Sequence, residues 1–190
     1  MAKQFCYDVE TCSTEDNAIV LSAALVWFDP EDREITFDQL VERTLYVKFQ
    51  AKEQAEAGRK VSKDTIEWWN KQGPLIKELC FKPSKKDLTA AEGIGQLRAY
   101  IKEHGDKSSF VWARGSLDQR VTESLCKTFD LEPIQHYNAW MDVRTAIRLL
   151  KDTSKHSGYC DIPNFNYDAV FKHSPIDDIA LDVLMLVQGV

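Results

Sequence analysis

The most constraining feature of the sequence is a nearly continuous apolar run close to its start. Residues 18–28 read Ala-Ile-Val-Leu-Ser-Ala-Ala-Leu-Val-Trp-Phe, and a turn at Asp29-Pro30 ends the run. The run is shorter than the roughly 20 apolar residues that a membrane helix needs. We therefore predict that residues 18–28 form a long strand buried in a folded core.

Further segments extend this strand into a larger sheet. Residues 3–9 and 44–50 are also typical of strands, so the first quarter of the chain is expected to be an antiparallel meander. Helices and short strands then alternate: helices are predicted at 62–72, 74–80, 89–105, 117–129, 142–151 and 175–188, strands at 109–113 and 136–140, and an irregular stretch at 152–172. This order predicts an α/β fold, with a mixed central sheet and helices on both faces, in a single domain over 1–190.

The charge of the chain argues against one class of function. The 190 residues include 24 Lys and Arg against 30 Asp and Glu, which gives a formal net charge of −6. A domain that binds nucleic acid through a basic surface usually has a pI above about 9. The composition leaves open an enzyme that holds nucleic acid through metal ions.

The N-terminus and the cysteines indicate an intracellular protein without membrane association. Residues 1–8 lack the apolar core of a signal peptide. The cysteines are odd in number and show no C-x-x-C spacing, which argues against a disulfide framework and a zinc site. They are Cys6, Cys12, Cys80, Cys126 and Cys160. We expect reduced thiols in a cytoplasm.

Two carboxylates stand at the end of the first expected strand. Asp8 and Glu10 are two positions apart, and residues i and i+2 of a strand point to the same face. Carboxylates that converge in this way suit a hard divalent cation such as Mg²⁺ or Mn²⁺. The competing interpretation is an edge strand whose acidic side chains are solvated.

Two later segments add ionisable side chains at element boundaries. Asp118 follows a short apolar strand and opens a helix, a position where Asp also serves as a cap. His173 lies five residues before Asp178, at the start of the last expected helix. A lone histidine in a loop is usually structural or solvent-exposed. Asp177 and Asp182 are interpreted as residues of the solvated face of that helix.

Taken in order, these three segments resemble the motifs of the DnaQ-like 3′-5′ exonuclease superfamily. Its members carry a D-x-E motif, then an Asp after a strand, then H-x-x-x-x-D in the DEDDh branch. The matching positions are Asp8, Glu10, Asp118, His173 and Asp178. The segments VSKDTIEWW at 61–69 and WMDVRT at 140–145 are similar to the phage exonuclease A (DexA-like) group and its bacterial exoribonuclease relatives.

The resemblance implies an RNase H-like fold and a metal-dependent hydrolase. Two divalent ions, Mg²⁺ or Mn²⁺, would be held by Asp8, Glu10, Asp118 and Asp178, and His173 would act as the general base. The reaction implied is the release of 5′-mononucleotides from the 3′ end of a nucleic acid.

Substrate contacts are expected from residues beside these motifs. The resemblance implies that the backbone around Val9 and Thr11 faces the terminal nucleotide. It also implies substrate contacts near Arg114, which stands where many relatives carry Asn. Trp68 and Trp69 are candidates for stacking on a base, a contact worth about 1–3 kcal/mol. The competing interpretation is that paired helical tryptophans belong to a core.

Single-stranded DNA is the expected substrate, and the sequence is compatible with three alternatives. One is the same chemistry on RNA, in an exoribonuclease that trims 3′ ends. Another is a non-catalytic nucleic-acid-binding or proofreading-type module with the same fold. The third is an α/β protein whose acidic residues are merely solvated. The similarity to phage exonucleases implies a place in the host cytoplasm, and the relatives imply a monomer or a homodimer.

Overall fold

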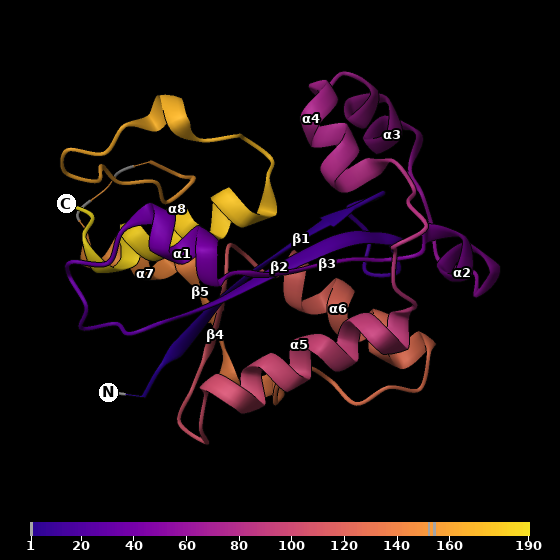
Figure 1. Cartoon of the computed structure of the whole chain (residues 1–190), viewed down its shortest axis with the longest axis horizontal. Helices are drawn as coiled ribbons and strands as arrows, with labels where there is room; N and C mark the ends of the chain where they lie inside the picture. The colour runs from indigo at the N-terminus through magenta and orange to yellow at the C-terminus, as the bar shows by residue number, and fades with distance from the viewer. Residues whose placement is uncertain (1, 152, 154) are drawn as a thin grey trace.

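The chain folds around a five-stranded mixed sheet (Figure 1), in a computed structural model that describes residues 2–151, 153 and 155–190. The strands are β1 (Gln4–Thr11), β2 (Val20–Phe28), β3 (Leu45–Lys48), β4 (Val111–Ala113) and β5 (Trp140–Asp142). Their order is β3-β2-β1-β4-β5, so β1 lies at the centre. β2 runs antiparallel to β1 and β3, whereas β4 runs parallel to β1 and β5. The predicted mixed α/β sheet is therefore confirmed.

Eight α-helices are found in the described part of the chain. They are α1 (Phe37–Arg43), α2 (Ala51–Glu56), α3 (Lys63–Asn70), α4 (Pro74–Ile76), α5 (Ala90–His104), α6 (Leu117–Thr128), α7 (Val143–Leu150) and α8 (Pro175–Val187). A π-helical turn, η1 (Lys77–Phe81), continues α4, and two 3₁₀ turns are η2 (Tyr137–Ala139) and η3 (Tyr167–Ala169). None of the helices described is long and apolar enough to cross a lipid bilayer.

Helices cover both faces of the sheet because β1 presents apolar side chains in both directions. Phe5, Tyr7 and Val9 belong to a core that includes residues of α5 and α6. Cys6 points the other way, into a core shared with α1, α7 and α8. Figure 1 shows these two groups of helices on opposite sides of the sheet. The even-numbered side chains of β1, which include Asp8 and Glu10, therefore lie on the α8 side.

A third, smaller core lies beyond the C-terminal end of β1. It joins Cys12 to the helical segment α3–η1, with Trp69, Ile76 and Cys80 buried inside it. The indole Nε1 of Trp69 donates a hydrogen bond of 2.9 Å to the carbonyl oxygen of Thr11. This bond fixes α3 to the strand that carries Asp8 and Glu10.

The structure differs from the predicted elements at three places. The patterns considered above predict neither α1 nor α2. Helix α1 begins at a capping box, in which Thr36 and Gln39 bond each other's backbone N–H groups. The strand predicted at 136–140 is wrong for most of its length, because η2 occupies that segment and β5 begins only at Trp140. Residues 152 and 154 of the predicted irregular stretch lie outside the described residues.

All five cysteines are buried and none forms a disulfide. Burial raises the pKa of the thiols of Cys12 and Cys80 to about 12 and that of Cys126 to about 11. A thiol with such a pKa is almost entirely protonated at neutral pH, which disfavours a nucleophilic role.

Candidate metal centre

Three carboxylates converge at the C-terminal end of β1. Asp8, Glu10 and Asp178 each offer a carboxylate oxygen, and these oxygens lie within 4.8 Å of one another. Asp8 and Glu10 share a face of β1, as predicted from their spacing. Asp178 comes from the first turn of α8, which packs on that same face. A bulge in the β1–β2 pairing follows Glu10, where Thr11 pairs with Val20 and Leu21 is skipped.

The electrostatics of this cluster fit a divalent cation. Burial raises the pKa of Asp8, and repulsion from Asp118 and Glu10 raises it further. Burial and the charge of Asp178 likewise raise the pKa of Glu10, and burial raises that of Asp178 to about 7. Within the residues described, no lysine, arginine or histidine forms an ion pair with any of the three. Oxygen ligands that repel one another without a compensating cation are a suitable donor set for Mg²⁺ or Mn²⁺.

Asp118 reaches the centre from the opposite face of the sheet. It lies in the first turn of α6, the crossover between β4 and β5, and its side chain is buried. Its carboxylate accepts a hydrogen bond from the Val9 backbone N–H. Burial and the nearby charge of Asp182 nevertheless raise its pKa to about 7. Asp118 is close enough to Asp8 to raise its pKa, but it lies outside the cluster formed by the other three carboxylates.

His173 precedes Ser174, the N-cap of α8, and has a partly exposed side chain and a backbone φ of +66°. Its backbone N–H donates to the carboxylate of Asp178, and its ring packs edge-on against Trp68, with 4.8 Å between ring centroids. A positive φ is uncommon for residues other than glycine and often marks a functional site. Partial burial and the charge of Lys172 lower the pKa of His173. The neutral form that a general base requires is therefore favoured near pH 7.

The two tryptophans of α3 have different environments. Trp68 is 37% exposed and contacts His173, so its ring borders the centre. Trp69 is 0% exposed and stacks on Phe81 inside the third core, with 5.6 Å between ring centroids. Stacking on a base is thus open to Trp68, whereas the Trp69 ring is enclosed by protein.

Two of the backbone groups expected to face the substrate have partners within the protein. Val9 donates its N–H to Asp118, and the Thr11 carbonyl accepts the indole N–H of Trp69. Both side chains are buried, and the Thr11 hydroxyl donates to the Ser13 carbonyl oxygen at 2.7 Å. These bonds fix the end of β1, and substrate contacts at Val9 and Thr11 stay a prediction.

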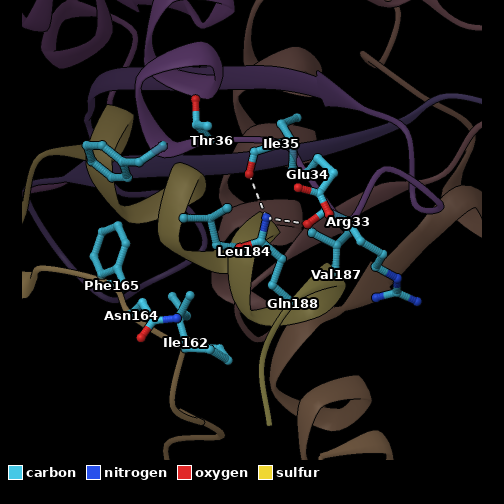
Figure 2. A pocket seen from close by; sticks show the side chains of 12 residues that line it. Arg33, Glu34, Ile35, Thr36, Ile162, Asn164, Phe165, Leu184, Val187 and Gln188 are labelled. Atoms are coloured by element: carbon cyan, nitrogen blue, oxygen red, sulfur yellow. Dashed lines mark hydrogen bonds between the residues drawn. The ribbon is translucent and has the colours of Figure 1, made fainter.

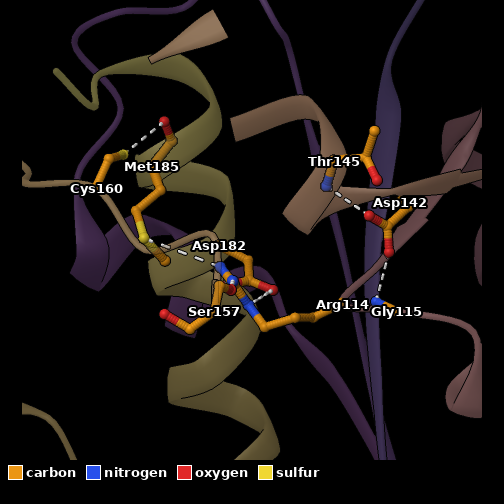
Figure 3. Close-up of polar contacts among 8 residues, drawn as sticks. All are labelled: Arg114, Gly115, Asp142, Thr145, Ser157, Cys160, Asp182 and Met185. Carbon is orange, nitrogen blue, oxygen red and sulfur yellow. Dashed lines mark hydrogen bonds and ion pairs between the residues drawn. The ribbon is translucent and has the colours of Figure 1, made fainter. Parts of the chain in front are cut away.

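Arg114 is held by Asp182 (Figure 3). Its Nη2 lies 2.6 Å and its Nε 2.9 Å from Asp182 Oδ1, and its Nη1 donates to the Ser157 carbonyl oxygen at 2.7 Å.

The interpretation of Asp177 and Asp182 as solvated residues is wrong, since both are less than 9% exposed. Asp177 instead accepts bonds from the Ser174 hydroxyl and a backbone N–H. Asp182 follows Asp178 by one helical turn, so the i,i+4 spacing already placed it on the same face.

Asp142, which lies within the WMDVRT segment, is a further positioning residue. One carboxylate oxygen accepts the Thr145 N–H and so caps α7, and the other accepts the Gly115 N–H at 2.7 Å (Figure 3). Gly115 has a φ of +92°, which favours glycine. Asp142 thereby holds the turn that leads from β4 to Asp118.

Two cavities differ in their relation to these residues. One, of about 670 Å³, lies between the Arg33–Thr36 segment and the C-terminal end of α8 (Figure 2). Gln188 closes part of it by donating to the carbonyl oxygens of Arg33 and Ile35. None of the predicted site residues lines this cavity. A smaller cavity, of about 370 Å³, is lined by both His173 and Asp178 and therefore borders the metal centre.

Two comparisons with known proteins place the chain among nucleases. A family model described as the 3′-5′ exoribonuclease Rv2179c-like domain matches residues 3–187. The chain is also 34% identical to a protein named exodeoxyribonuclease from Enterobacteria phage T4, over 203 aligned positions. That alignment covers 96% of this chain and 86% of the phage protein.

Proposed function

The chain belongs to the 3′-5′ exoribonuclease Rv2179c-like family, and we propose that it is a metal-dependent 3′-5′ exonuclease of single-stranded DNA. The observation that carries the proposal is the convergence of Asp8, Glu10 and Asp178 beside His173. A non-catalytic module of the same fold would not need this set of repelling carboxylates together with a histidine in its neutral form.

The proposed mechanism divides the work among five side chains. Asp8, Glu10, Asp118 and Asp178 would hold two divalent ions, which when bound supply a more nucleophilic water and stabilise charge on the leaving oxygen. His173 takes the proton from the attacking water, because its lowered pKa keeps the imidazole neutral near pH 7. The edge-on contact with Trp68 limits the orientations of the imidazole. The product is a 5′-mononucleotide.

The choice between DNA and RNA rests on the relatives. The phage protein, whose name specifies DNA, and the family model, whose description specifies RNA, each align with nearly the whole chain. We propose DNA as the preferred substrate and keep 3′-end trimming of RNA as the second candidate. Mononucleotide release should be measured with Mg²⁺ or Mn²⁺ on single strands of the same sequence in DNA and RNA. A higher kcat/KM on RNA would reverse the preference, and release from neither would contradict the proposed function.

Metal binding should stabilise the protein more at neutral than at acidic pH. The pKa values of Asp118 and Asp178 are raised to about 7, above the value of about 3.9 in an unfolded chain. Between these two pKa values, the metal-free folded state therefore binds more protons than the unfolded state. The free energy of unfolding of the metal-free protein consequently falls as the pH rises toward 7. Mg²⁺ or Mn²⁺ at about 100 times its Kd should raise the Tm by roughly 5–10 °C at pH 7.5.

The comparison is a thermal melt at pH 7.5 and pH 5, with and without the divalent ion. The shift should be smaller at pH 5, where protons compete with the metal for the carboxylates. Equal ionic strength from KCl serves as the control for charge screening. A metal-induced shift that is absent at pH 7.5, or larger at pH 5, would contradict the assignment of the cluster as a metal site.

A further inference from the structure

The cavity beside His173 and Asp178 has aromatic walls and an apolar floor. Leu181 and Met185, from α8, form the floor and are buried. Tyr159 and Tyr167, from the loop before α8, line the walls, with 41% and 49% of their surfaces exposed. The volume of about 370 Å³ falls in the range of small-molecule pockets, about 300–1,000 Å³. Two half-exposed tyrosines on a pocket wall suit a planar ligand.

The Tyr159 ring is fixed in place by charged groups beneath it. The Arg114 guanidinium lies 4.1 Å from the ring centroid, and Arg114 is itself held by the buried carboxylate of Asp182. The proposed catalytic mechanism uses neither Arg114 nor Asp182. The two residues instead hold the Tyr159 ring beside the metal centre. Tyr167 is held separately, because its hydroxyl accepts a hydrogen bond from the Ile162 N–H.

We propose that this cavity binds the base of the 3′-terminal nucleotide, with Tyr159 as a stacking surface. The inference rests on the proposed exonuclease function. The 3′-terminal nucleotide has no further nucleotide attached to it, so its base can occupy a cavity with a closed floor. The rest of the strand, on the 5′ side of the cleaved bond, must extend into solvent. Lys172, which also lines the cavity, supplies a positive charge for the phosphate. Stacking recognises the face of any base, so the site would tolerate all four.

The test compares two oligonucleotides that differ only at the 3′ end, where one carries an ordinary nucleotide and the other an abasic deoxyribose. For the unaltered protein with Mn²⁺, kcat/KM should be about tenfold higher on the base-bearing end, as expected for one stacking contact. Tyr159→Ala should remove this difference by raising KM on the base-bearing substrate alone. Tyr159→Phe, which keeps the ring, should behave like the unaltered protein.

Tyr137→Ala is the matched control, because Tyr137 is exposed but precedes β5, at the end of the sheet opposite the metal centre. Tyr137→Ala should leave unchanged the ratio of kcat/KM on the base-bearing end to kcat/KM on the abasic end. Equal kcat/KM values on the two substrates would overturn the inference while leaving the exonuclease function intact. An equal loss on both substrates in Tyr159→Ala would also overturn it, since Tyr159 would then serve only to support Arg114. Release from neither substrate would overturn the proposed function and this inference with it.

Discussion

Replacing Asp178 with asparagine is expected to lower kcat on the order of 10³-fold while leaving the chain folded. Asp178 is one of the three converging carboxylates, and loss of a metal ligand removes several kcal/mol of transition-state stabilisation. The asparagine carbonyl can still accept the His173 N–H. Removing one of three repelling charges should leave the metal-free protein at least as stable as before.

The measurement is mononucleotide release at saturating Mn²⁺, together with a melt of the metal-free protein. Asp168→Asn is the matched control, since Asp168 is an exposed carboxylate in η3, outside the cluster. It should retain full activity. If Asp178→Asn keeps more than about a tenth of the activity, the assignment of the metal centre is wrong.

Replacing His173 with alanine should lower kcat by about 10²–10⁴-fold, the usual contribution of a general base. His173 is not one of the clustered carboxylates, so the metal-induced rise in Tm should persist in this variant. Because the base acts in its neutral form, the rate of the unaltered protein should fall as pH drops through the pKa of His173. That pKa is lowered below its usual value of about 6.5.

Single-turnover rates between pH 5 and pH 8.5 at saturating metal test this assignment. His173→Ala should lack the acidic limb of the profile, and added imidazole should restore part of the rate. His156→Ala, which alters another exposed histidine, should keep the full profile. A His173→Ala variant with the same acidic limb and near-normal rate would identify a different base.

Much of the fold followed from local patterns. Alternation on β1, the long apolar strand β2 and the helical spacing of α5, α6 and α8 are properties of neighbouring residues. They predicted a mixed sheet covered on both faces. The helices α1 and α2 were missed because they are short, and the T-x-x-Q capping box of α1 is the signal that could have revealed the first.

The candidate site was predicted unevenly, for physical reasons. The pairing of Asp8 with Glu10 depends only on strand periodicity. Trp68 and Trp69 are adjacent and similar in the sequence, yet one borders the centre and the other is enclosed, because successive helical positions face different directions. The Arg114–Asp182 pair joins residues 68 positions apart, and no local pattern indicates it.

The sequence by itself determined the donor chemistry of this protein: carboxylates and a histidine at the ends of predicted elements. The tertiary structure alone decided which of them meet. The sheet order places β1 at the centre, α8 packs on the face to which Asp8 and Glu10 point, and the crossover after β4 brings Asp118 from the other face. Local periodicity specifies the direction of a side chain within its own element, whereas distances between elements arise only from the packing of the whole core.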